Sequence, residues 1–101
     1  MKYEAIKKVP GGKFFRIKID ADTNINALSL TGDFFLHPEE SLPAIEKSLI
    51  GLPTQTPENI FAEKIHSALA EQKANFIGVT AEDIAQTIIE AINETQKPKA
   101  E

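Results

Sequence analysis

The period of the hydrophobic pattern changes once along this chain, between residues 30 and 40, and that change constrains what the chain can fold into. Before it, residues 13–20 alternate, with Phe15, Ile17 and Ile19 on one side of an extended backbone. Such alternation is typical of a strand with one buried face. After it, apolar residues recur every three or four positions, which is typical of helices packed on a core. The pattern therefore predicts strands first and helices afterwards.

Two turn clusters divide the first third of the chain into three strands. The first cluster is Pro10-Gly11-Gly12, and the second spans residues 20–24, which are rich in aspartate and asparagine. They leave expected strands at residues 3–9, 13–20 and 25–31. Short strands joined by tight turns predict an antiparallel meander with one face that must be covered.

Three helices are expected to cover that face. The first begins at Pro38, because proline suits a first helical position, and ends at Gly51. Pro43 lies in its second turn and indicates a later start or a small kink. Thr56 caps the second helix, and a capping box at Thr80 opens the third. The residues expected to face the core are Leu42, Ile45 and Leu49, then Ile60, Phe61, Ile65, Ala68 and Leu69, then Ile84, Ile88, Ala91 and Ile92.

These elements define the fold class as α+β, a three-stranded antiparallel meander followed by about three helices packed on one face. Residues 75–79 fit either a short strand or a loop held by Phe76 and Ile77. A chain of 101 residues has the usual size of one domain. We expect that domain to span residues 1–94 and a flexible polar tail to span residues 95–101.

The composition excludes several classes of protein. There is no cysteine, which excludes disulfides, zinc–thiolate sites and thiol nucleophiles. The residues after Met1 are charged and contain no apolar signal segment, which predicts a cytoplasmic protein without a membrane span. The net charge of −4 argues against a nucleic-acid partner. Cations near the start fit solvation of an exposed strand face better than phosphate binding. They are Lys7, Lys8, Lys13, Arg16 and Lys18.

No arrangement of residues predicts catalysis by this chain alone. Asp20, Asp22 and Asn24 match the first ligands of a calcium loop, but the glycine and the closing glutamate of that loop are missing, so a turn is favoured. Glu63 and His66 form a Glu-x-x-His step without the second copy that a di-metal site needs, and His66 is expected to be exposed. We assign no catalytic, cofactor-binding or metal-binding residue to this chain.

The junction between the strands and the first helix is the part of the chain most suited to contact a partner. It contains Gly32, Asp33, Phe34 and Phe35, two bulky rings in a segment that is usually polar. Adjacent side chains of an extended backbone point to opposite sides. If one ring enters the core, the other is therefore available to a partner.

This junction and its surroundings resemble the C-terminal accessory domain of lipoate–protein ligases. The resemblance covers most of residues 2–94, and its most distinctive part is the junction with the helix that follows it. The matching segments are Pro10-Gly11-Gly12-Lys13, Leu30-Thr31-Gly32-Asp33-Phe34-Phe35, Pro38-Glu39-Glu40, Leu42, Ile45-Glu46, Leu49-Ile50-Gly51 and the late helix after Gly78-Val79-Thr80.

The resemblance implies a non-catalytic role in ATP-dependent lipoylation. In that family a large domain binds ATP and lipoate, makes lipoyl-adenylate and passes the lipoyl group to a lysine on a carrier domain. The small domain follows it or forms a separate subunit, and a chain that starts at Met1 with only the small domain resembles the separate form. The implied partners are a large catalytic subunit and, indirectly, lipoyl carrier domains. ATP, lipoate and Mg²⁺ would belong to the complex, with no cofactor bound by this chain alone.

The expected partner interface joins the strand–helix junction to the preceding turn. Its residues are Gly11, Gly12, Lys13, Gly32, Asp33, Phe34 and Phe35. Lys13 or Arg16 could also contact an anionic adenylate. Two other functions remain open: a cysteine-free adaptor with the element order of sulfur-transfer scaffold domains, and a small-molecule binder with an apolar cleft between sheet and helices.

Overall fold

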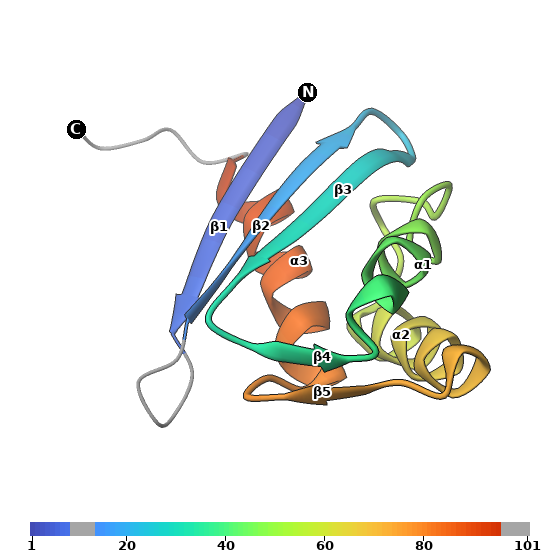
Figure 1. Ribbon diagram of the computed structural model, residues 1–101. Helices are drawn as coiled ribbons and strands as arrows, with labels where there is room; N and C mark the ends of the chain where they lie inside the picture. The colour runs from blue at the N-terminus through green and yellow to red at the C-terminus, as the bar shows by residue number, and fades with distance from the viewer. Residues whose placement is uncertain (9–13, 96–101) are drawn as a thin grey trace.

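The computed structural model describes residues 1–8 and 14–95. The three strands of the meander and the helices follow one another in the predicted order, with the three-stranded sheet on one side and the helices on the other (Figure 1). The elements are β1 (Lys2–Lys8), β2 (Phe14–Ala21), β3 (Ile25–Gly32), β4 (Phe35–His37), the short 3₁₀ helix η1 (Glu39–Ser41), α1 (Leu42–Lys47), α2 (Glu58–Gln72), β5 (Asn75–Ile77) and α3 (Ala81–Thr95). The predicted α+β fold, a meander followed by three helices, is confirmed.

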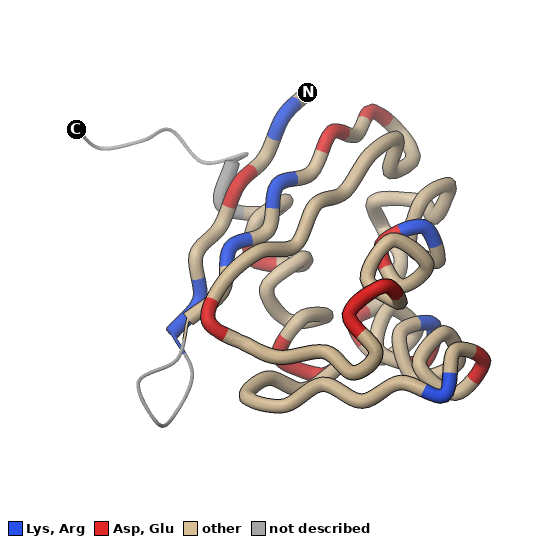
Figure 2. The backbone as a smooth tube through the Cα atoms, viewed as in Figure 1, with Lys and Arg blue, Asp and Glu red and all other residues tan. Residues whose placement is uncertain are grey.

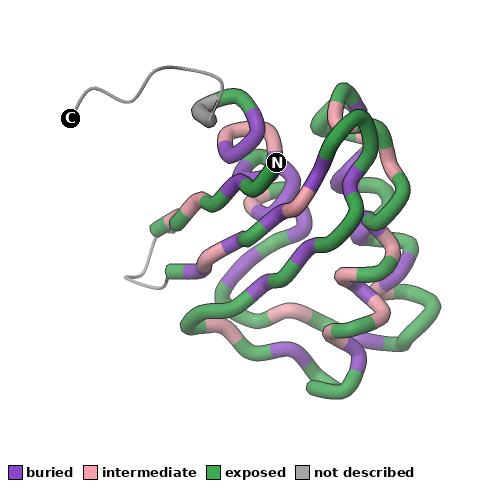
Figure 3. The backbone as a smooth tube through the Cα atoms, turned by 90° about the horizontal axis from the view of Figure 1, so that it is seen from above, coloured by how far each residue is buried: buried purple, intermediate pink, exposed green. Residues whose placement is uncertain are grey.

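The meander is antiparallel throughout, in the order β1-β2-β3, and its two faces differ as predicted. Phe15, Ile17 and Ile19 of β2 are at most 2% exposed and face the helices. Their neighbours along the strand turn toward solvent, so burial alternates along β2 and, in β3, from Leu28 to Thr31 (Figure 3). One face of the sheet thus belongs to the core.

The core lies between this inner face and the apolar sides of the helices. Most residues that the helical period predicted to be buried are buried, including Phe61 and Ile65 of α2 and Ile88 of α3. Ile60 and Leu69, at the border of the α2 stripe, are half-buried. The predicted capping box closes the start of α3, because the Thr80 and Asp83 amides each donate to the other residue's side chain, at 3.1 and 3.0 Å.

The first helix begins later than predicted. Pro38 precedes the single turn of η1, and the α-helix starts only at Leu42, which leaves Pro43 in its first turn. A proline is tolerated there because first-turn amides have no partner within the helix. The later start, one of the two interpretations of Pro43, is therefore correct, and the expectation of a helix from Pro38 is wrong.

Residues 75–77 form a strand rather than a loop, and they pair with a strand that the pattern did not predict. β4 and β5 run antiparallel, with Phe35 opposite Ile77 and Leu36 opposite Phe76. This two-stranded sheet lies beyond the end of the meander (Figure 1). It connects the strand–helix junction to the segment that leads into α3.

The outer edge of β3 is closed by α1 and the loop that follows it. The Leu30 amide donates to Oε2 of Glu46 at 2.8 Å, and the Gly51 amide donates to the Ile25 carbonyl at 2.7 Å. These bonds satisfy edge groups that would otherwise face solvent. No helix in the described part of the chain has both the length and the apolar character needed to cross a membrane.

Candidate functional site

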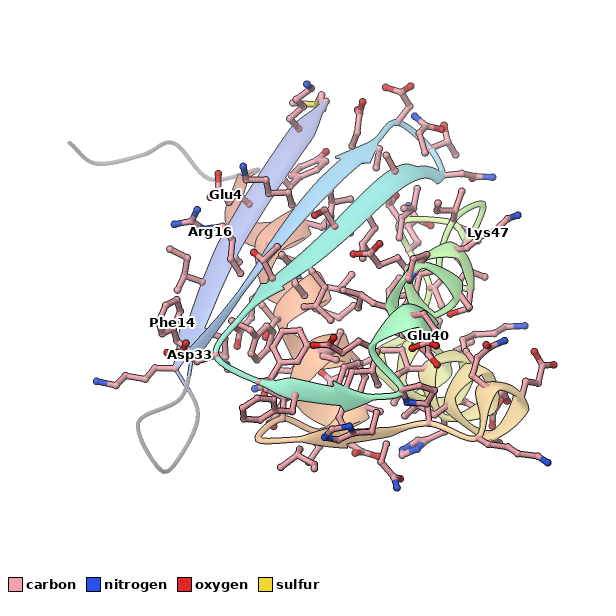
Figure 4. All side chains as sticks on the ribbon, viewed as in Figure 1. Glu4, Phe14, Arg16, Asp33, Glu40 and Lys47 are labelled. Carbon is pink, nitrogen blue, oxygen red and sulfur yellow. The ribbon has the colours of Figure 1, made fainter. Side chains whose placement is uncertain are left out.

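The strand–helix junction is held by a close approach of two backbones. Gly32 lies opposite Phe15 in the sheet with a φ of 146°, and a Cβ at this position would lie 2.5 Å from the Phe14 carbonyl oxygen. One residue on, the Asp33 amide donates to that same oxygen at 2.8 Å. The start of β2 and the end of β3 are therefore locked together, with Phe14 and Asp33 at the surface beside each other (Figure 4).

The two adjacent phenylalanines point in opposite directions, as predicted. Phe34 packs against the core and meets Phe76 edge-on, with ring centroids 5.6 Å apart. Phe35 is 58% exposed and stacks on His37, with centroids 6.4 Å apart and ring planes 13° from parallel. The sequence did not show which ring turns outward; the structure shows that it is Phe35.

Phe35 belongs to a small apolar surface that we call the β4–β5 face, made of Phe35, His37 and Ile77. Ile77 lies directly opposite Phe35 and is 53% exposed, while Leu36 and Phe76 turn the other way, toward the core. Exposed apolar side chains on a rigid, core-backed strand pair are suited to bind another protein. This arrangement is the candidate functional site.

The structure brings some of the predicted interface residues together and not others. Gly32 and Asp33 hold the junction in place, and Phe35 forms part of the exposed face. Phe34 packs mainly against the core. Gly11, Gly12 and Lys13 lie outside the described residues. The sequence did not predict that His37 and Ile77 lie on this exposed face, because the first was interpreted as part of a helix start and the second as a core contact. Three residues of β5 are too few for a recognisable alternation, so no local signal placed Ile77 on this face.

Arg16 lies on the face of the sheet that points away from the helices. Its Nε is 3.1 Å from Oε2 of Glu4 on the neighbouring strand, an ion pair between half-exposed side chains (Figure 4). A contact of Arg16 with a nucleotide stays a prediction.

His66 pairs with an acid that lies outside the Glu-x-x-His step. Its Nε2 lies 2.8 Å from Oε2 of Glu82, at the start of α3, and both side chains are more than half exposed, as expected for His66. Among the described residues, no three side chains of the metal-binding types His, Cys, Asp and Glu gather in one place. The pair joins α2 to α3 at the surface, in a shallow groove also lined by Glu58, Asn59, Ala62 and Glu63.

We expect this pair to make a small contribution to stability that depends on pH. The hydrogen bond with His66 holds the pKa of Glu82 below its ordinary value of 4.5. A depressed pKa in the folded state stabilises the fold above pH 4.5 and ceases to do so as the pH falls through the lowered value. Glu82→Gln should therefore lower the thermal midpoint slightly near neutral pH, and the difference should vanish well below pH 4.5.

The matched control is Glu63→Gln, in the same groove, which leaves the pair of His66 and Glu82 intact and should leave the thermal midpoint at neutral pH as in the wild type. Equal midpoints for the wild type and Glu82→Gln at neutral pH would show that solvent screens the pair completely.

Comparison with known proteins gives one informative similarity. A structure of an archaeal lipoylation system, comprising a bipartite lipoate protein ligase and its E2 lipoyl domain from Thermoplasma acidophilum, contains a chain similar to this one. The two chains are 28% identical, the match covers 87% of this chain and 94% of that chain, and the TM-score is 0.71. No protein-family model and no curated protein matches the sequence.

This similarity supports the resemblance inferred from the junction only as far as the lipoylation system to which the similar chain belongs. The chain is similar in fold and in sequence to a component of a lipoate ligase system. The narrower expectation, the accessory domain of such a ligase, stays a prediction.

Proposed function

We propose that this chain is the non-catalytic small subunit of a two-component lipoate–protein ligase. With a large subunit, it would support the ATP-dependent conversion of lipoate to lipoyl-adenylate, which precedes transfer to a lysine of a carrier domain. The observation that carries the proposal is the similarity, over nearly the whole of both chains, to a component of an archaeal lipoylation system with a bipartite ligase. ATP, lipoate and Mg²⁺ would be held by the large subunit, in the cytoplasm.

The β4–β5 face is the surface by which this chain would bind the large subunit. Phe35 and Ile77 project side by side from a strand pair whose other side is anchored in the core. Docking here would bury both side chains against the partner. A surface added in this way can order the loops of an active site and exclude water from a reactive adenylate.

The experiment that tests this function is lipoate-dependent ATP–pyrophosphate exchange by the large subunit of the same organism, with and without this chain. We expect exchange to appear, or to rise at least tenfold, only when the two chains are mixed. The size of that rise corresponds to about 1.4 kcal/mol or more of transition-state stabilisation.

Two controls make the result specific. Omission of lipoate should abolish the stimulated exchange, and analytical ultracentrifugation should show a complex of the two chains. Unchanged exchange together with no complex would show that the proposal is wrong and would favour the adaptor function.

A further inference from the structure

The strand β1 forms the edge of the meander that no other element covers with backbone hydrogen bonds. Among the described residues β1 pairs with β2 alone, whereas α1 and the loop after it close the outer edge of β3. An edge strand carries amide and carbonyl groups that can pair with a further strand. In Figure 1 this edge is the outer margin of the sheet, away from the labels of β4 and β5.

The register of the β1–β2 ladder shows which backbone groups of β1 point outward. Met1 and Ala21 exchange two backbone hydrogen bonds, of 2.8 and 3.0 Å. Because such pairs alternate along an antiparallel ladder, odd-numbered residues of β1 direct their backbone groups to β2 and even-numbered residues direct theirs outward. The even-numbered residues, whose side chains are also exposed, are Lys2, Glu4, Ile6 and Lys8.

These four residues are complementary to a second copy of the same strand. Two copies that pair antiparallel about a two-fold axis must oppose even-numbered residues, since only those have outward backbone groups. With Ile6 opposite Ile6 of the second copy, Glu4 of each copy lies opposite Lys8 of the other. Figure 2 shows the pattern behind this match, an acidic segment of β1 between basic segments. Both charge pairs therefore unite opposite signs, and the exposed apolar side chain meets its own copy.

The neighbouring registers are unfavourable. Pairing centred on Ala5 would place Lys2 opposite Lys8, and pairing centred on Glu4 would oppose two carboxylates. Pairing centred on Lys7 would place Ile6 opposite Lys8. Opposite charges directly across two strands contribute about 0.2–1 kcal/mol per pair, and like charges are destabilising. The sequence of β1 thus selects one register of self-association.

The helical layer behind the edge is also compatible with a second copy. Lys7, on the inner side of β1, donates to both carboxylate oxygens of Glu90 on α3, each at 3.0 Å, so its charge is already neutralised. Gln86 and Asn93 are exposed and lie about one turn before and after Glu90, on the same side of α3. The side of α3 beside the edge therefore presents uncharged amides to the α3 of a second copy.

We infer that two copies of this chain associate through their β1 edges, with Ile6 at the two-fold axis, and form one continuous sheet with three strands from each copy. Each facing pair can exchange two backbone hydrogen bonds. Glu4 uses Oε2 for Arg16, and its other oxygen is placed to accept from Lys8 of the second copy (Figure 4). The contact leaves the β4–β5 face exposed, so the inference does not depend on the proposed function.

The test is a reciprocal exchange of charges, with the association of the full chain measured by sedimentation equilibrium. The wild type should dimerise with a dissociation constant on the order of 10 μM, as a small contact does. Glu4→Lys and Lys8→Glu each place like charges opposite each other, so each variant alone should dimerise about tenfold more weakly. An equimolar mixture of the two variants should dimerise as the wild type does, because every charge again meets its opposite.

Other variants serve as controls for folding and for the site. Lys64→Glu changes the charge equally at an exposed position of α2 and should leave dimerisation unchanged. Circular dichroism compares the folding of all variants. Should Glu4→Lys fail to fold because it loses the contact with Arg16, Ile6→Lys replaces it. That variant brings two cations together at the axis and should also weaken the dimer about tenfold.

Three outcomes would overturn the inference. A wild type that stays monomeric up to about 1 mM would show that the edge does not associate with itself. A wild-type dimer without restored association in the mixture of folded variants would place the contact on another surface or in another register. Conversion of the dimer to a one-to-one complex on addition of the large subunit would show that the edge belongs to that partner.

Discussion

Replacing Phe35 with alanine is expected to weaken binding between this chain and the catalytic subunit that we propose as its partner about 30-fold or more, with little change in the stability of the isolated chain. The ring is 58% exposed and lies beside Ile77 at the centre of the β4–β5 face. Central aromatic anchors of interfaces typically contribute about 2 kcal/mol or more when truncated. Isothermal titration calorimetry measures the affinity, and urea unfolding measures the stability.

Two other variants show whether the effect is specific. Phe34→Ala should lower stability, because that ring packs on Phe76 and the core. Ile50→Ala removes an apolar side chain of comparable exposure, 43%, in the turn after α1, and should change neither quantity. Wild-type affinity in Phe35→Ala, or loss of affinity only through unfolding, would show that the β4–β5 face is not the docking surface.

Replacing Gly32 with alanine is expected to destabilise the fold by about 3 kcal/mol, a large part of the 5–15 kcal/mol that holds a domain of this size together. The added Cβ would lie 2.5 Å from the Phe14 carbonyl oxygen and from the Phe15 Cα, and neither backbone atom can move without breaking the β2–β3 ladder. The φ of 146° adds strain for any residue with a side chain. Urea unfolding followed by circular dichroism gives the loss.

Gly51 provides the matched control. It also has a positive φ, 92°, but a Cβ there would meet no atom within 4 Å. Gly51→Ala should therefore introduce backbone strain without a collision. We expect it to lower the free energy of unfolding by about 1 kcal/mol. Equal losses in the two variants would show that β2 and β3 can separate at the junction at little cost.

The meander and the helices were predictable because each is specified by a local period. Alternation along residues 13–20 identified the buried face of β2, and the capping box at Thr80 located the start of α3 to the residue. Both signals lie within a few residues of the structure that they predict. Neither depends on how distant parts of the chain meet.

The β4–β5 pair was not predictable in the same way. Each strand has three residues, too few for a period, and each supplies the other's hydrogen bonds from about 40 positions away in the chain. The helix start was also misplaced, since Pro38 fits a first helical position by composition alone. His66 was assigned no partner because Glu82 lies on another helix.

The lack of a local sequence signal for the β4–β5 pair also limits what could be predicted of the candidate site. Opposite orientations of Phe34 and Phe35 follow from any extended backbone. Which of them faces outward depends on Phe76, whose position comes from β5. Ile77 joins the exposed face for the same reason, so this one of its three residues could not be assigned before the pairing was known.

The pairing of β4 with β5 also has a consequence for biosynthesis. Phe35 leaves the ribosome well before Ile77, so a nascent chain that ends before residue 77 holds only part of the surface that we assign to partner binding. Assembly with a partner through this surface must then follow completion of nearly the whole domain. Copies that end before residue 77 would lack Ile77 from this surface and, under the proposed function, would bind the partner more weakly.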